Sequence, residues 1–93
     1  MIDLGVRLAA EFLGTLLLVL TIVATGGSSI YTGAVLAVII FLIGNVSGGH
    51  VNPAVSLAMF LSGSLSLSTF LGYSFVQLLG GLTAVYAYKA TVA

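Results

Sequence analysis

The sequence lacks cysteine altogether and has very few charged side chains. No disulfide, thiolate metal site or cysteine nucleophile can be built from it. The formal charges are Asp3, Arg7, Glu11 and Lys89, so the net charge is zero and two cations make no patch for nucleic acid. A soluble domain keeps about a quarter of its residues charged. A chain with 4% charged and 60% hydrophobic residues must instead be solvated by lipid.

The sequence also lacks the residue sets that catalysis requires. It shows no nucleophile–base pair, no phosphate-binding loop and no paired carboxylates. Its single histidine, His50, has neither a second histidine nor a cysteine with which to hold a metal. We therefore expect no enzyme, no resident metal and no cofactor.

Long apolar runs make up most of the chain. A helix needs about 20 residues to cross about 30 Å of hydrocarbon. We expect membrane spans at about 6–25, 30–46 and 65–89, within one domain that covers residues 1–93. Arg7 ahead of the first run would also fit a signal peptide, but Glu11 lies inside that run and Ala24-Thr25-Gly26 is a poor cleavage site. The first run is therefore expected to remain as a span.

One further apolar piece is too short to cross the membrane. It belongs to a re-entrant segment expected at 47–62, whose helical part from Pro53 to about Leu61 would reach only about 13–14 Å. Asn52 is a favoured N-cap, and proline is well suited to the first helical position. Irregular backbone at this depth survives only where it is buried in protein or lines a wet cavity. The segment therefore predicts a pore element.

Three motifs stand out, from Ala10 to Thr15, from Ser47 to Val55, and at Tyr73, Gln77 and Gly80-Gly81. Together they resemble the aquaporin and glycerol-facilitator family of major intrinsic proteins. The run from Ser47 to Val55 resembles the family's first re-entrant loop, and the run from Ala10 to Thr15 resembles its first helix. Tyr73, Gln77 and Gly80-Gly81 resemble its third helix. The motifs come in the family's order and cover nearly the whole chain. The resemblance implies an all-α membrane protein with three transmembrane helices and one re-entrant half-helix, acting as a passive channel for water or small neutral, glycerol-like solutes.

The resemblance also assigns roles to single residues. Asn52-Pro53-Ala54 would form the half-helix motif, with the Asn52 amide donating to solute at the pore centre. A ladder of backbone carbonyls would lead to it, from Gly48, Gly49 and His50. Glu11 would be a buried carboxylate that braces a re-entrant loop across the pseudo-two-fold axis, and Gln77 would hydrogen-bond between helices.

The resemblance is to the first half of the family only. Members are more than twice as long and contain two inverted halves, whereas this sequence shows no internal repeat. Val55 stands where the second half carries an arginine. One half cannot enclose a pore, and its loop backbone would face lipid. We expect a second copy in inverted orientation, and by analogy four such dimers, because Arg7 and Lys89 flank opposite sides and give no orientation bias.

A gapless comparison with the family predicts the constriction. It places Thr32 of one chain with Ile40, Gly49 and Val55 of the second copy. These residues would form a wider and less polar filter than one selective for water. Two alternatives stay open: a non-conducting fragment or subunit that pairs with another half- or full-length aquaporin, and a dual-topology coupled transporter.

Overall fold

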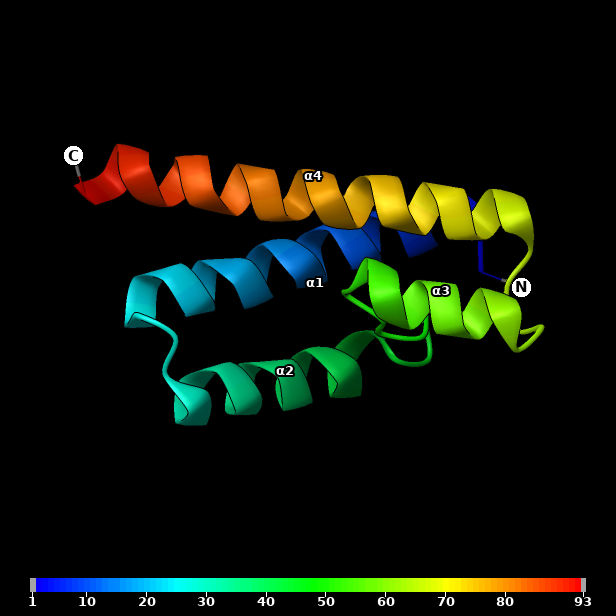
Figure 1. Ribbon diagram of the computed structural model, residues 1–93, viewed down its shortest axis with the longest axis horizontal. Coiled ribbons are helices and arrows are strands. Elements are labelled where there is room, and N and C mark those ends of the chain that lie inside the picture. The colour runs from blue at the N-terminus through cyan, green and yellow to red at the C-terminus, as the bar shows by residue number, and fades with distance from the viewer. Residues whose placement is uncertain (1, 93) are drawn as a thin grey trace.

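The computed structural model describes residues 2–92 and contains four α-helices within them (Figure 1). The helices are α1 (Leu4–Thr25), α2 (Ser29–Ile43), α3 (Pro53–Leu61) and α4 (Leu67–Val92). The described residues include no strand, so the predicted all-α fold is confirmed. The bundle measures 41 × 24 × 22 Å, and the two ends of the chain lie at opposite ends of its long axis (Figure 1).

Capping residues determine where the first two helices begin and where α1 ends. Asp3 accepts a hydrogen bond from the Gly5 amide at 3.0 Å and so caps the start of α1. Gly26 ends α1 in the left-handed conformation, with φ 66°. Ser28 then caps α2 by accepting from the Tyr31 amide at 3.3 Å. The turn between the helices is short, so α1 and α2 run antiparallel as neighbours.

Two helices are long and apolar enough to cross a membrane. These are α1 with 22 residues and α4 with 26. Helix α4 begins two residues after the start of the expected span of 65–89 and ends three residues after the end of that span. Helix α2 has 15 residues and would reach only about 22 Å. Helical hydrogen bonding continues beyond it, from Ser47 N to Ile43 O at 2.9 Å and from Gly48 N to Gly44 O at 3.1 Å.

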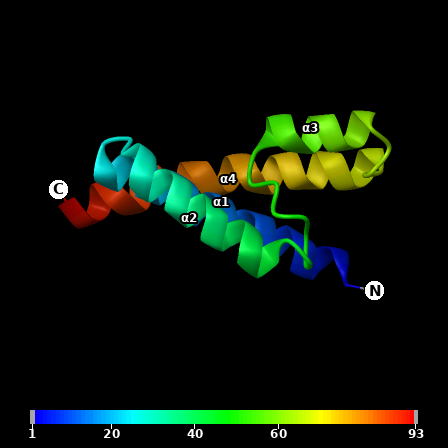
Figure 2. The same ribbon diagram turned by 90° about the horizontal axis from the view of Figure 1, so that it is seen from below.

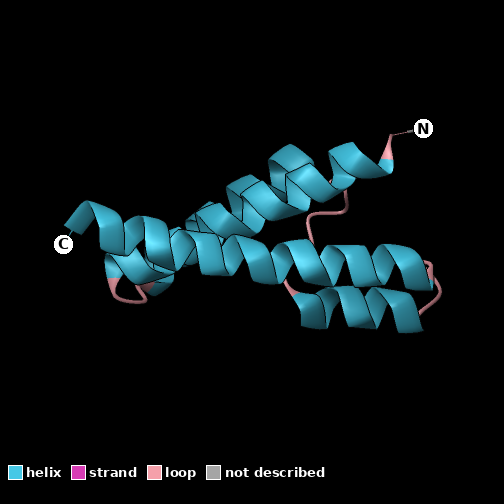
Figure 3. Cartoon of the chain, turned by 90° about the horizontal axis from the view of Figure 1, so that it is seen from above, coloured by secondary structure: helices cyan, strands magenta, loops and turns pink. Residues whose placement is uncertain are grey.

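The chain doubles back after α2 and enters the short helix α3. Its bounds, Pro53–Leu61, match the half-helix expected from the sequence. Helix α3 lies alongside the first half of α4 and leaves the second half uncovered (Figures 2 and 3). The Phe60 and Phe70 rings stack with centroids 5.3 Å apart and hold the two helices together.

The interior of the bundle is polar, and its outside is apolar. The largest fully buried side chains are Tyr73, Gln77, Glu11 and Ser56, whereas most large apolar side chains are exposed. This distribution is the reverse of a soluble core. Helices α1 and α4 also pack closely. A Cβ at Gly80 would lie 2.7 Å from the Phe12 carbonyl oxygen, so the two helices meet backbone to backbone there.

Candidate pore element and its buried network

Glu11 of α1 is completely buried and binds the re-entrant loop. Its Oε1 accepts from the Val51 amide at 2.7 Å and from Gln77 Nε2 at 2.9 Å. Its Oε2 accepts from the Ser47 hydroxyl at 2.7 Å and from the His50 amide at 3.0 Å. An ionised carboxylate offers about four acceptor sites. All four are used, by donors from the loop and from α4.

This geometry corrects one prediction. Glu11 was expected to brace a loop across the pseudo-two-fold axis, in a second copy, but its carboxylate binds the loop of its own chain. The reason is that this loop returns beside α1 and carries two N–H groups with no helical partner. Such donors need an acceptor at this depth, where water is scarce.

A second tie joins α1, α4 and the loop. The Tyr73 hydroxyl donates to the Ser47 carbonyl at 2.6 Å, and Arg7 Nε donates to the same hydroxyl at 3.2 Å. The Arg7 guanidinium also lies 5.5 Å from the centre of the Tyr73 ring. From the sequence, Arg7 was expected only to influence the orientation of the chain in the membrane. Arg7 and Glu11 are four residues apart, as are Tyr73 and Gln77. This spacing places both members of each pair on one face of a helix and could have predicted that they act together.

Ser56 ties α3 to the same network and was not predicted to belong to it. Its hydroxyl is completely buried, accepts from Gln77 Nε2 at 2.9 Å and lies 2.9 Å from His50 Nδ1. His50 in turn stands edge-on to the Tyr73 ring, with centroids 5.3 Å apart. Gln77 therefore links Glu11 to α3, a bracing position consistent with the role that the resemblance implied.

The loop backbone is strained at one residue that is not glycine. Gly48 and Gly49 have φ of 100° and 64°, which glycine adopts freely, but Val51 has φ of 47°. A β-branched residue in this region is unusual, and such strain costs on the order of 1–3 kcal/mol. The charge-assisted bond from the Val51 amide to Glu11, worth about 1.5–3 kcal/mol, offsets it. Glu11 thus holds the loop in its shape.

Asn52 caps α3 and keeps a donor free. Its Oδ1 accepts from the Ala54 amide at 2.8 Å, and Pro53 occupies the first turn, where it has no N–H to lose. Because the side-chain oxygen is used as the cap, the amide NH₂ group points away from the helix. Asn52 is exposed, so this NH₂ group is available to a solute.

The constriction was predicted from Thr32 of one copy and from Ile40, Gly49 and Val55 of the other, and the single chain shows only how these residues lie within one copy. Ile40 and Gly49 are adjacent, because a Cβ at Gly49 would lie 3.3 Å from the Ile40 Cα. Ile40 and Val55 are 45% and 37% exposed. Thr32 lies two turns before Ile40 on α2, about 12 Å by helical rise. Its buried hydroxyl has no hydrogen-bond partner among the described residues.

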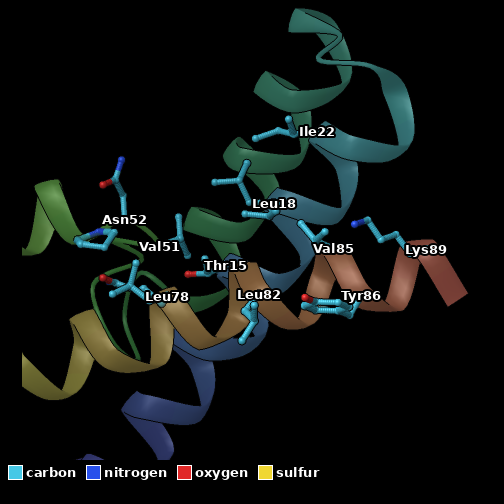
Figure 4. A pocket seen from close by; sticks show the side chains of 14 residues that line it. Thr15, Leu18, Ile22, Val51, Asn52, Leu78, Leu82, Val85, Tyr86 and Lys89 are labelled. Carbon is cyan, nitrogen blue, oxygen red and sulfur yellow. The ribbon is translucent and has the colours of Figure 1, made fainter.

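An open groove continues the line of α3 along the bundle. Its volume is about 730 Å³, and it lies where the second half of α4 is not covered by α3. Asn52 and Lys89 mark its two ends (Figure 4). Its walls are mostly apolar side chains of α1 and α4, among them Leu18, Ile22, Leu82 and Val85.

Comparison of the sequence with known proteins shows the family to which the chain belongs. Residues 6–93 match the family model of the major intrinsic proteins. The chain belongs to the major intrinsic protein family. It is 42% identical to the lens fiber major intrinsic protein of Gallus gallus over 84 residues, covering 78% of this chain and 32% of the relative. It is 38% identical to the aquaglyceroporin AqpS of Rhizobium meliloti over 95 residues, covering 86% and 41%.

A third relative has a similar extent. The glycerol uptake facilitator protein-like 6 of Lactiplantibacillus plantarum is 35% identical over 91 residues, covering 89% of this chain and 42% of the relative. The chain thus spans about a third to two fifths of the length of the curated relatives it matches. No solved structure matches the chain significantly.

Family membership settles the broad class of this major intrinsic protein. The family consists of integral membrane channels rather than enzymes. The apolar helices α1 and α4 fit a membrane-embedded protein, and the polar interior with an apolar outside fits the same setting.

Proposed function

We propose that this chain forms a passive channel for water and small neutral solutes together with a second copy in inverted orientation. The observation that carries the proposal is the groove of about 730 Å³ beside Asn52 and Pro53. Helix α3 lies alongside the first half of α4 (Figure 2), and the groove runs between α1 and the second half of α4 (Figure 4). A second half-helix would fill this groove.

The groove has the length of such a helix. Along α4 it runs from Gln77 to Lys89, a rise of about 18 Å. Helix α3 has nine residues, a length of about 13–14 Å, with its capping residues beyond. A two-fold axis through the inner end of the groove would bring two α3 N-termini, and hence two Asn52 residues, together near the membrane centre.

The polar groups at the start of α3 and in the loop before it suit neutral solutes. The two Asn52 amides would donate to a passing oxygen, and the carbonyls of Gly48, Gly49 and His50 would accept from it. Two opposed helix N-termini place partial positive charge at the centre, which repels cations. The apolar side chain of Val55 would leave the constriction less polar than an arginine would. Glycerol-like molecules, as named for two relatives, are therefore proposed to pass as well as water.

Flux into liposomes tests the proposal. Vesicles with the purified chain should swell or shrink faster than empty vesicles when water or glycerol gradients are imposed in a stopped-flow instrument. Asn52→Ser keeps an N-cap acceptor but removes the amide donor. Two lost donor bonds of about 1 kcal/mol each should slow flux by about tenfold or more.

The matched control is Asp3→Asn, which changes the N-cap of α1 far from the groove and should leave flux unchanged. Flux no greater than in empty vesicles for the unaltered chain would contradict the channel. It would favour the alternative of a subunit that pairs with another aquaporin. Flux that saturates with solute and depends on a proton gradient would favour the coupled-transporter alternative.

A further inference from the structure

The re-entrant loop by itself would attract cations. The Glu11 carboxylate lies directly behind the loop and is completely buried, and the carbonyls of Gly48, Gly49 and His50 are the proposed acceptors for solute. Carbonyls and carboxylates are the groups from which cation channels build their filters. Val55 stands where a filter arginine would be, and the half-helix dipoles act only at the centre. The approach to the centre therefore needs a positive charge of its own.

Arg7 is the cation that lies near the loop. Its Nε donates to the Tyr73 hydroxyl at 3.2 Å, and the same hydroxyl donates to the Ser47 carbonyl at 2.6 Å. Tyr73 is completely buried, so this bond turns the guanidinium into the bundle instead of outward to the lipid headgroups. The other cation of the sequence, Lys89, lies about 18 Å beyond Gln77 by helical rise.

The Arg7 charge is not neutralised by a direct ion pair among the described residues. Asp3, four residues earlier, caps α1 by accepting from the Gly5 amide. The acceptor sites of Glu11 are filled by donors from the loop and from α4. Within the part of the chain that the structure describes, the Arg7 side chain therefore donates to Tyr73 alone. Its charge is free to act on ions that approach the loop.

Arg7 lies on the side from which the loop is entered. Helix α3 leads from the loop toward the end of the bundle where the N-terminus lies (Figure 1). Arg7 is on the same side, one turn before Glu11, about 6 Å by helical rise. A solute that enters from this end would therefore pass the level of Arg7 before it reaches the level of Glu11.

The contacts of Arg7 set the size of its effect. The guanidinium is 5.5 Å from the centre of the Tyr73 ring, and this centre is 5.3 Å from the centre of the His50 ring. The greatest separation that these contacts allow between the guanidinium and the His50 ring centre is about 11 Å. At that separation and an effective dielectric constant of about 20, two unit charges repel strongly enough to slow passage about tenfold.

We propose that Arg7 is a specificity-determining residue of the channel, which keeps cations out of the path along the loop by offsetting the charge of Glu11. The inference rests on the proposed channel, because it requires that solutes pass along this loop. By symmetry the second copy would place its own Arg7 at the opposite entrance. Arg7 thus controls the ratio of cation flux to water flux.

Moving the positive charge outward tests this role. The double variant Ile2→Arg, Arg7→Gln keeps the number of cations on this flank, and hence the orientation signal, but carries the charge to an exposed position ahead of α1. Rubidium uptake and water flux are measured on liposomes that contain the purified chain. We expect the ratio of rubidium flux to water flux to rise about tenfold or more. The matched variant Arg7→Lys, which keeps a cation in place, should stay within about twofold of the original.

A single thiol allows the charge to be restored within one folded protein. The chain has no cysteine, so the variant Ile2→Arg, Arg7→Cys reacts at one position only. With a methanethiosulfonate reagent that attaches a neutral methylthio group, the vesicles should take up rubidium. With the reagent that attaches an aminoethylthio group, which is an ammonium, uptake relative to water flux should fall about tenfold. A merely structural role for the bond from Arg7 to Tyr73 would change both fluxes together and would not depend on the charge of the adduct.

The outcomes separate this inference from the proposed function. If the unaltered chain does not pass water, the channel and the inference both fail. If water passes but neither the displaced arginine nor the neutral adduct admits rubidium, only the inference is overturned, and the same holds if the unaltered chain passes rubidium as readily as these two. If the displaced-arginine variant does not fold, the comparison of the two adducts decides.

Discussion

Replacing Glu11 by glutamine exchanges one carboxylate oxygen for an NH₂ group that cannot accept. If the NH₂ group takes the place of Oε1, it faces the Val51 amide and the Gln77 amide. Gln77 can then reverse, because its Oε1 has no partner, and Ser56 can turn its hydroxyl to donate to it. The Val51 N–H is left without an acceptor.

The other orientation of the glutamine gives the same result at a different residue. If the NH₂ group takes the place of Oε2, it faces the Ser47 hydroxyl and the His50 amide. The hydroxyl can rotate and accept, but the His50 N–H cannot. Either way one buried backbone N–H is orphaned, which costs about 1–3 kcal/mol. The three remaining bonds lose the charge that strengthened them, at about 1 kcal/mol each.

The expected loss in stability of the loop is therefore about 4–6 kcal/mol. Hydrogen–deuterium exchange of the protein in detergent or nanodiscs measures it at the peptide covering residues 47–52. Because 1.4 kcal/mol is a factor of ten in an equilibrium constant, the His50 and Val51 amides should exchange at least a hundredfold faster in Glu11→Gln. Asp3→Asn removes the carboxylate that caps the start of α1 and should leave this peptide unchanged. Unaltered exchange in Glu11→Gln would refute the assigned role.

Two further substitutions test the packing and the second tie. Gly80→Ala should destabilise the bundle by about 1–3 kcal/mol, because its Cβ would lie 2.7 Å from the Phe12 carbonyl oxygen; Gly81→Ala, whose nearest contact is at 3.7 Å, should not. Denaturation in mixed micelles compares the pair, and equal stabilities would contradict the close contact. Tyr73→Phe orphans the Ser47 carbonyl and should cost about 1–3 kcal/mol in the same assay. A Tyr73→Phe protein as stable as the original would remove that tie from the account.

Helix α3 could be predicted from sequence because its signals are local. Asn52 and Pro53 are the residues that start a helix, and both act there as expected. The polar Gly-rich run before them likewise predicted irregular backbone, which the positive φ angles of Gly48 and Gly49 confirm. Membership of the family followed from motifs that cover most of the chain.

The contacts between segments could not be predicted in the same way. Which loop Glu11 reaches depends on how closely the chain folds back on α1, and from the sequence we expected the loop of a second copy instead. Ser56 shows no pattern of its own, because a serine on a short helix is equally suited to solvent or to a buried bond. The groove is a product of unequal helix lengths packed together, and only the three-dimensional arrangement reveals it.

Accessibility of the chain's termini tests the central claim most directly. The sequence has no cysteine, so a single cysteine at exposed Ile2, or in a second protein at exposed Thr91, is the sole site for a membrane-impermeant thiol reagent. In sealed cells the reagent should label about half of the molecules at each position, with the rest labelled only after the membrane is opened. Labelling of either terminus exclusively from one side would contradict a channel built from two inverted copies.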